Sequence, residues 1–203
     1  MAAGKLGQRI AHAPFFAVQL FKAKGEALKK EVATFAEKMK PVIAAAEEMD
    51  QIIAIENHGN NIIDSPDSMR WLLEFTQSPR LGIAFAPHHL CPRYLPLDGV
   101  ALGKLARELG PDGIAYVYAQ QYGKGSHHKQ PRTDELLQMP GRGPLDFGPL
   151  VRTLRDIDYR GFTEIFMHPY PRGLPILDST AAITAELNRS RSYLDAFLKD
   201  PSQ

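Results

Sequence analysis

The stretch IIAIENHGNN, residues 52–61, decides the fold that this sequence predicts. Four apolar residues, three of them isoleucine, run directly into the carboxylate of Glu56, and Asn57, His58 and Gly59 follow. A short apolar run that does not alternate with polar residues is typical of a strand buried on both faces. Parallel sheets carry their functional groups at the carboxyl ends of such strands. Glu56 is therefore the first candidate for a functional residue.

The composition describes a globular chain without a strong charge. The 203 residues are 44% hydrophobic, which suffices for one buried core. Lys plus Arg number 24 and Asp plus Glu number 23, a formal net charge of +1, so we expect neither a nucleic-acid nor a membrane partner. No apolar run has the length of a membrane helix. The single cysteine, Cys91, excludes an internal disulfide and fits a reducing, cytoplasmic compartment.

The first residues have an unusual charge pattern, because four basic residues precede the first acid, Glu26. A signal or transit peptide is one interpretation of the apolar run that lies among them. Gln19, Lys22 and Lys24 interrupt that pattern, and no small-residue cleavage site follows. We therefore favour an ordinary strand with an irregular start.

Strands and helices are expected to alternate along the chain. Short apolar runs predict strands at 14–21, 52–56, 81–86, 113–120 and 161–167. Apolar residues spaced three to four apart predict helices at 25–50, 65–77, 98–110, 146–159 and 178–200. This order predicts an α/β fold with a parallel sheet, either an open sheet or part of a (β/α)8 barrel.

Several residues mark where these elements begin, end or bend. Ser65 caps a helix whose first turn contains a proline, and Asp178 or Ser179 caps the last helix. Gly110 is a normal helix end, and Pro41 predicts a kink or a local break in the first helix. Residues 122–145 are rich in Gly, Pro, Lys and His and predict a long loop.

Polar side chains follow the predicted strands where each strand ends. The set contains two carboxylates and four imidazoles: Glu56, Glu164, His58, His88, His89 and His168. Oxygen and imidazole ligands together suit Mn, Zn, Co or Fe. A buried carboxylate needs a cation, a metal or a hydrogen-bond network, which favours a functional role for both glutamates. A single imidazole at a strand end is more commonly a hydrogen-bonded structural residue.

Other site motifs are missing from the sequence. No Gly-rich phosphate fingerprint follows the first strand, and there is no G-x-S-x-G elbow. Cys91 lies near His88 and His89 in the chain, but this proximity does not make a nucleophile pair, and we interpret it as a buried structural thiol.

Four pieces, IAIENHGNN, SPDSMRWLLEF, LGIAFAPHHL and GFTEIFMHP, resemble in this order the sugar phosphate isomerase/epimerase family, the xylose isomerase-like barrels that include endonuclease IV. The resemblance covers residues 25–197. It implies a TIM barrel with a divalent metal at the C-terminal rim of the strands. It also implies isomerisation or epimerisation of a sugar or sugar phosphate by proton transfer next to a carbonyl.

The implied metal ligands are only partly present. Glu56 matches the Glu that ends the family's fifth strand, and Glu164 matches the Glu of the eighth. His89 matches a His that follows an Asp at the end of the sixth strand, but Ala86 stands at the Asp position. Tyr118 stands where the seventh strand supplies a His. The resemblance thus implies Mn, Mg, Zn or Co held by Glu56, Glu164 and His89, with two usual ligands replaced.

The resemblance also implies roles in the reaction. Glu56 and Glu164 are the expected base and acid, on opposite sides of the sugar. The expected substrate-binding residues are His58, His89, His168 and Arg172, the last of them toward a phosphate. The alternatives are a metal-free or non-catalytic relative that binds a sugar or polyol, and an inactive fragment. Phosphodiester cleavage as in endonuclease IV is disfavoured by the low net charge.

The length of the chain is short for this fold. If Glu56 ends the fifth strand, then 14–21 is the fourth, and strands four to eight are present with their helices. A complete barrel takes about 250 residues. We therefore expect residues 1–203 to form one incomplete TIM-barrel domain, with 1–24 as an atypical start that reflects truncation or misassignment. Its two sheet edges also favour a homo-oligomer.

Overall fold

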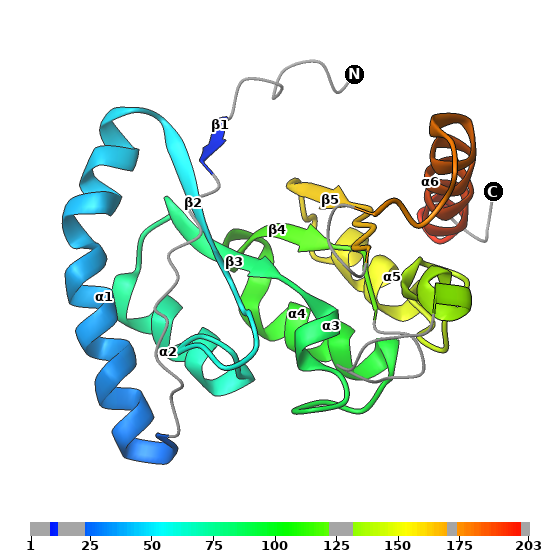
Figure 1. The fold of residues 1–203 in the computed structure, drawn as a ribbon. Coiled ribbons are helices and arrows are strands. Elements are labelled where there is room, and N and C mark those ends of the chain that lie inside the picture. The colour runs from blue at the N-terminus through cyan, green and yellow to red at the C-terminus, as the bar shows by residue number, and fades with distance from the viewer. Residues whose placement is uncertain (1–8, 12–22, 122–131, 170–173, 200–203) are drawn as a thin grey trace.

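The computed structural model describes residues 9–11, 23–121, 132–169 and 174–199, which form one parallel sheet with flanking helices (Figure 1). The strands are β1 (Arg9–Ala11), β2 (Gln51–Glu56), β3 (Leu81–Phe85), β4 (Ile114–Tyr118) and β5 (Phe162–Glu164). The helices are α1 (Gly25–Glu48), α2 (Pro66–Thr76), α3 (Pro87–Leu90), α4 (Gly99–Gly113), α5 (Gly148–Asp156), α6 (Thr180–Asp195) and the 3-10 helix η2 (Arg132–Gln138).

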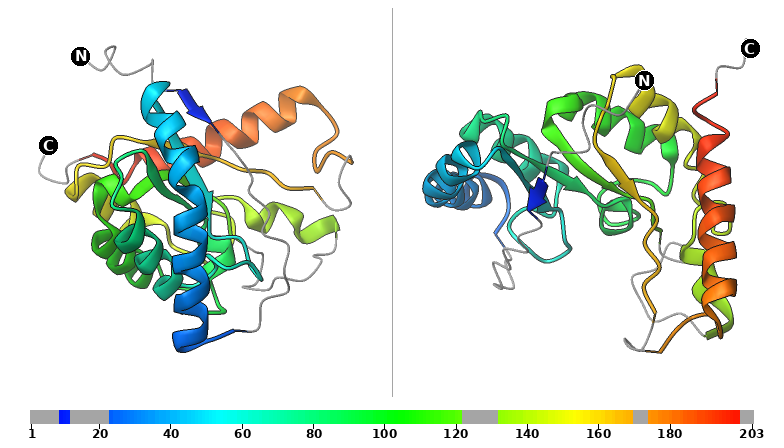
Figure 2. Two further views of the ribbon diagram at one scale, coloured as in Figure 1. Left: turned by 90° about the vertical axis from the view of Figure 1, so that its left-hand side faces the viewer. Right: turned by 90° about the horizontal axis from the view of Figure 1, so that it is seen from above.

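The strands lie side by side in the order in which they occur along the chain, β1-β2-β3-β4-β5, and every pair is parallel. This topology confirms the predicted α/β class with a parallel sheet. It is the sheet order of a (β/α)8 barrel. Among the described residues the sheet stays open, with β1 and β5 as its terminal strands. Figure 2 shows α1 and α6 at opposite ends of this open sheet.

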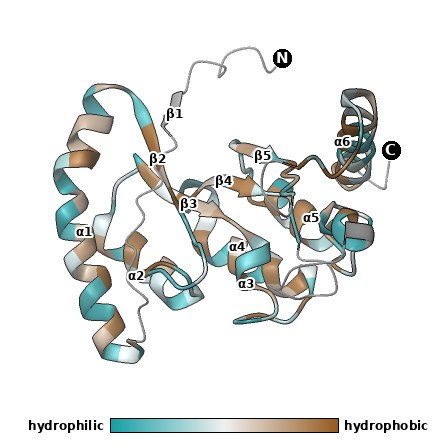
Figure 3. Cartoon of the chain, viewed as in Figure 1, coloured by the Kyte–Doolittle hydropathy of each residue, from teal (hydrophilic) through white to brown (hydrophobic). Residues whose placement is uncertain are grey.

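The two faces of the sheet carry different side chains because successive residues of a strand point to opposite sides. One face packs against the helices, and its core includes Ile53, Ile83 and Phe85. On the other face a smaller cluster contains Ala54 and the similarly small residues that follow on β3 and β4, joined by two tyrosines. Figure 3 shows apolar colour along β2, β3 and β4 and alternating colour on α1, as expected for a helix with one buried side.

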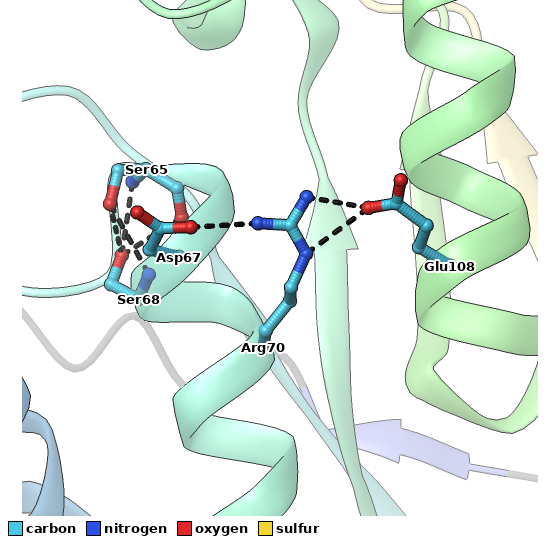
Figure 4. A network of polar contacts seen from close by, with 5 residues as sticks. All are labelled: Ser65, Asp67, Ser68, Arg70 and Glu108. Carbon is cyan, nitrogen blue, oxygen red and sulfur yellow. Dashed lines mark hydrogen bonds and ion pairs between the residues drawn. The ribbon is translucent and has the colours of Figure 1, made fainter.

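Helix α2 begins as its sequence predicts. The Ser65 hydroxyl accepts a hydrogen bond from the Ser68 backbone N–H at 3.3 Å, and the Ser68 hydroxyl accepts one from the Ser65 N–H at 3.0 Å. This reciprocal pair is a capping box. Arg70 then bridges Asp67, at 2.8 Å, and Glu108 of α4, at 2.5 Å (Figure 4). The ion pair joins two neighbouring helices on the outside of the sheet.

Some boundaries differ from the predicted ones. Helix α1 continues through Pro41, because Met39 and Ile43 are buried on either side of the proline and keep the helix packed against the core. Gly110 does end the regular part of α4, with φ of 73°. The predicted loop contains η2, and the predicted strand at 14–21 lies outside the described residues. The strand that the structure describes beside β2 at this edge of the sheet is β1.

Helix α5 and strand β5 are both shorter than predicted. Beyond Glu164, residues 165–169 belong to no helix or strand. Among the described residues, no helix is both long enough and apolar enough to cross a membrane.

Candidate active site

Glu56 is the last residue of β2 and lies opposite Ala84 of β3 in the sheet register. It belongs to the same face as Ala54, two residues earlier, and therefore to the face that does not pack against the helices. Ala84 and Ala86 on β3 and its end are fully buried. Because the residues at these positions are small, the side chains that follow on α3 occupy the rim beside Glu56.

Asn57 fixes the start of α3. Its side-chain amide donates to the carbonyl oxygen of Ala86 at 3.1 Å, and its amide oxygen accepts from the Ala86 N–H at 2.7 Å. Asn57 is fully buried, so both bonds form in a low-dielectric environment. Ala86 is the residue before α3. The clamp therefore holds the short helix that carries His88 and His89.

The histidines form a packed group beside Glu56. His89 Nε2 lies 3.4 Å from Glu56 Oε1, and the rings of His58 and His88 lie 4.2 Å and 4.1 Å from the His89 ring, centroid to centroid. His88 and His89 are buried. Burial lowers the pKa of His89, and the hydrogen bond that His89 donates to Glu56 opposes this effect only in part. The neutral imidazole is the form that accepts hydrogen bonds or ligates a metal.

Glu56, His88 and His89 form a group that can hold a metal ion. One ligand atom from each of them lies within 4.8 Å of the ligand atoms of the other two. Within the described part of the chain, this is the one group of at least three His, Cys, Asp or Glu side chains with such spacing, and Glu164 does not belong to it. Two imidazoles and a carboxylate are a donor set that suits Zn, Fe, Co or Mn.

Glu164 stands at the opposite side of the rim, at the end of β5, paired in register with Tyr118. The Tyr116 hydroxyl donates a hydrogen bond to Glu164 Oε2. Burial raises the pKa of Tyr116, and the hydrogen bond to Glu164 raises it further. The phenol therefore stays protonated, and the Glu164 carboxylate has a fixed hydrogen-bond donor.

Tyr118 lies between the two glutamates. It is buried, and burial raises the pKa of its phenol, as do the negative charges of Glu56 and Glu164. Its ring packs edge-on against His88 at 6.0 Å and near Phe166 at 5.7 Å. Where the family has a histidine, the chain thus carries a protonated hydroxyl group whose pKa both carboxylates raise.

His168 follows β5, and a second amide holds its backbone. Gln138 Oε1 accepts from the His168 N–H at 2.6 Å, and Gln138 Nε2 donates to the His168 carbonyl at 3.1 Å. The His168 ring stacks on Phe166 with centroids 5.6 Å apart. A series of ring contacts therefore runs along the rim from His58 through His89, His88, Tyr118 and Phe166 to His168.

The structure brings together most of the side chains that the sequence singles out. Both carboxylates and all four imidazoles lie along this rim, whereas Arg172 lies outside the described residues. The sequence interpretation missed Tyr116, although its spacing of two from Tyr118 indicates the same face of a strand. It also missed the clamps of Asn57 and Gln138, for which no local pattern gives a signal.

Cys91 takes no part in this arrangement. Its thiol donates to the Pro96 carbonyl oxygen at 3.1 Å, and burial raises its pKa to about 11. A protonated thiol is a poor nucleophile. This agrees with its interpretation as a buried structural residue.

The fold and the rim define the class of protein as a TIM-barrel protein with acidic and imidazole side chains at the carboxyl ends of its strands. The chain belongs to the xylose isomerase-like TIM barrel family, whose sequence model matches residues 2–192. This match confirms the family resemblance and the fold class. No curated protein sequence matches the chain.

Solved structures with similar folds include sugar epimerases. D-psicose 3-epimerase in the presence of D-fructose has a TM-score of 0.63 at 15% identity, over 90% of this chain and 61% of that protein. The apo form of 3-keto-D-glucoside 4-epimerase YcjR from E. coli has a TM-score of 0.57 at 15% identity, over 84% of this chain and 57% of that protein. The IOLI protein with a bound zinc atom has a TM-score of 0.57 at 14% identity, over 88% of this chain and 59% of that protein. The chain thus spans 57 to 61% of the length of these proteins, and the likeness concerns the fold.

Proposed function

We propose that the chain is a sugar isomerase- or epimerase-like protein that transfers a proton at the carbon next to a sugar carbonyl. Its family and the epimerases among its structural neighbours support this class. The observation that carries the proposal is the pair of carboxylates, Glu56 and Glu164, at one rim with the Tyr118 hydroxyl between them. In epimerisation one such group removes the proton from one face of the carbon and a second group returns a proton to the other face, and two separated carboxylates suit these roles.

In the proposed reaction, one carboxylate removes the proton from the carbon next to the carbonyl, and an enediolate forms. Return of a proton to the other face of the same carbon gives the epimer. Return of the proton to the former carbonyl carbon, together with transfer of the hydroxyl proton to the former carbonyl oxygen, gives the isomer. Tyr116 orients Glu164 through its hydrogen bond. Tyr118 donates a hydrogen bond to the oxygen that gains negative charge.

A divalent cation, when bound at this rim, supplies polarisation of the carbonyl and hydroxyl oxygens of the sugar. The donor set of Glu56, His88 and His89 fits such an ion. His58, His89 and His168 are the proposed contacts to substrate hydroxyls, since their rings lie along the same rim. A phosphate contact by Arg172, a homo-oligomer and a cytoplasmic location stay predictions from the sequence.

The test is proton exchange on D-fructose in D2O, followed by NMR, with and without added Mn2+. We expect the wild-type chain to exchange the hydrogen next to the carbonyl. Glu164→Gln should abolish this exchange and leave the circular dichroism spectrum unchanged, because an amide cannot accept the proton. Glu74→Gln, an exposed carboxylate on α2, is the matched control. Retained exchange in Glu164→Gln would refute the scheme of two glutamates.

A second candidate is a metal-free relative that binds a sugar or polyol without turnover. Ala86 and Tyr118, which replace two usual ligands of the family, favour it. This alternative predicts that D-fructose binds to the folded chain but exchanges no proton under any metal condition. The double variant Ala86→Asp, Tyr118→His should then acquire metal affinity that the wild type does not have.

A further inference from the structure

We propose that a pocket between α1 and α2 is a second sugar-binding subsite, which takes the second ring of a ketose glycoside. The inference rests on the proposed function for the first ring, the ketose that lies at the rim of Glu56 and Glu164. It adds the substrate class, since a substrate that fills both places has more than one sugar ring. We call this cavity the α1–α2 pocket.

The α1–α2 pocket has a volume of about 780 Å³ and lies where the two helices begin. The helices lie side by side (Figure 1). α1 contributes Leu28, α2 contributes Trp71, and the loop between β2 and α2 contributes Asn60, Asn61 and Asp64. Small-molecule sites commonly have volumes of about 300–1,000 Å³ and combine apolar walls with a few fixed polar groups. The α1–α2 pocket has both features.

Asp64 organises the polar wall of the pocket. It is 6% exposed, and its carboxylate accepts hydrogen bonds from the Asn60 backbone N–H at 2.9 Å and from the Tyr94 hydroxyl at 2.9 Å. Arg93 Nη1 lies 3.1 Å from Asp64 Oδ2 and donates to Asn60 Oδ1 at 3.0 Å. Bonds of this charge-assisted kind hold the arginine and the tyrosine in place. They therefore reduce the freedom that these side chains lose when a ligand binds.

The chemistry of the pocket fits a neutral sugar ring. Two basic side chains, Lys24 and Arg93, and two acidic ones, Asp64 and Asp67, line it, so their formal charges cancel and favour no anionic group. Among the described residues, the hydrogen bonds and ion pairs of Arg93 involve only Nη1, which leaves the Nε and Nη2 donors for ligand hydroxyls. Trp71 supplies an apolar surface for the C–H face of a sugar ring.

Gly59 is the point where the pocket adjoins the rim. A Cβ at this position would lie 3.6 Å from His89 Nδ1 and 3.7 Å from Arg93 Nη1. His89 belongs to the rim and Arg93 lines the pocket, so the two sites are neighbours at this glycine. Both lie at the carboxyl end of β2, because the loop after that strand leads into α2. This arrangement suits a ketose that carries a second ring.

The experiment uses the fluorescence of Trp71, the only tryptophan of the chain, so the signal reports on this pocket. The full chain is titrated with lactulose, in which galactose is attached to fructose, and with D-fructose alone. Lactulose should shift the emission of Trp71 in a saturable way and should reduce its quenching by acrylamide. D-fructose at the same concentrations should change neither, because a single ring occupies the rim.

Arg93→Lys tests the polar wall. It removes the donors of the guanidinium but keeps a positive charge beside Asp64. The variant should bind lactulose about 10-fold more weakly, because hydrogen bonds to charged groups contribute at about that level. Arg80→Lys is the matched control, since Arg80 pairs with Asp50 and is not among the described residues that line the pocket. If Arg93→Lys does not fold, the acrylamide measurement on the wild type decides.

Three results overturn the proposal. The first is the absence of a response of Trp71 to lactulose in a chain that circular dichroism shows to be folded. The second is an equal response to D-fructose, which would mean that one ring suffices. The third is an affinity for lactulose that Arg93→Lys leaves unchanged or that both variants lower equally.

The outcomes for the subsite and for the reaction can be told apart. A response of Trp71 to lactulose without proton exchange on either sugar supports this subsite and contradicts the proposed function. Proton exchange on D-fructose without a response of Trp71 to lactulose contradicts this subsite and leaves the proposed function standing. If both proposals hold, proton exchange on lactulose should have a lower KM than on D-fructose, because the second ring adds binding energy. Equal KM values would contradict the link between the two sites.

Discussion

At the residue scale, Tyr118 changes the chemistry of the rim. The family resemblance predicts a histidine here, and histidine ligates a metal through a lone pair on nitrogen. Tyr118 is buried near two carboxylates. Burial is the main cause that raises the pKa of its phenol, and the negative charges of the carboxylates raise this pKa further. A phenol that keeps its proton is a hydrogen-bond donor. Tyr118 therefore replaces a metal ligand by a hydrogen-bond donor, and under the proposed function this donor serves an oxygen of the substrate.

Tyr118→Phe tests that role. The ring packing against His88 and Phe166 stays, but the hydroxyl donor is lost. We expect the rate of proton exchange on D-fructose to fall by about 10²–10³, the usual effect of removing one donor to a developing oxyanion. Zn2+ affinity should be unchanged. The exchange rate is measured by NMR at saturating sugar, and an unchanged rate would mean that the hydroxyl has only a structural role.

At the element scale, α6 is attached to the rest of the chain through ion pairs. Glu186 accepts hydrogen bonds from Arg142 at 2.6 Å and 2.8 Å, and Arg189 of the same helix contacts Glu186 at 2.7 Å and the Pro140 carbonyl at 2.7 Å. Glu186 is only 5% exposed. Figure 1 shows α6 at the end of the sheet, beyond α5. This cluster therefore joins the last helix to the segment after η2.

The pKa of Glu186 makes this attachment sensitive to acid. Burial alone raises that pKa, but the hydrogen bonds and charges of Arg142 and Arg189 outweigh burial and lower it. A carboxyl whose pKa is lower in the folded state stabilises the fold above its unfolded pKa of about 4.3, and this stabilisation is lost as the pH falls further.

Glu186→Gln measures that contribution. The thermal midpoint of the variant should lie below that of the wild type at pH 7, and the difference should shrink below about pH 4, because the wild-type carboxyl then takes up a proton. Midpoints are measured by circular dichroism between pH 3 and 7. Glu26→Gln, an exposed carboxylate in the first turn of α1, is the control. A difference that stays constant across this range would contradict the predicted pH dependence.

At the scale of the whole molecule, the described residues form an open sheet with two terminal strands, β1 and β5. β5 has three residues, and Phe162 on it is 50% exposed. Unpaired strand edges with apolar side chains favour association with another chain. That residues 1–203 form a single domain and that the chain self-associates both stay predictions.

Phe162→Lys tests the association through β5. A charge on a terminal strand opposes edge-to-edge pairing. We expect the wild type to sediment as a dimer or larger species at micromolar concentration, and the variant to shift toward the monomer. Val100→Lys is the control, because Val100 is an exposed apolar residue on α4, away from both terminal strands. A monomeric wild type, or an equal shift in both variants, would contradict the role of this edge.

The sequence alone determined the fold class and the positions of most of the helices and strands. The apolar run before Glu56 predicts a buried parallel strand, Ser65 and Pro66 predict the start of α2, and Gly110 predicts the end of regular helix in α4. Such signals work because periodicity, caps and glycine conformations depend on a few neighbouring residues. Pro41 is the exception, since the buried side of α1 keeps that helix continuous.

Only the tertiary structure decided how the rim is built. Asn57 clamps Ala86, 29 residues away, Gln138 clamps His168, 30 residues away, and Tyr116 reaches Glu164 across 48 residues. No local pattern encodes these pairs, because the order of the strands in the sheet brings them together. The sequence pattern indicated the carboxylates and imidazoles of the rim. The contacts of His89 with Glu56 at the end of β2 and of His88 with Tyr118 of β4 decided that His88 joins Glu56 and His89, because they set which ligand atoms lie close together.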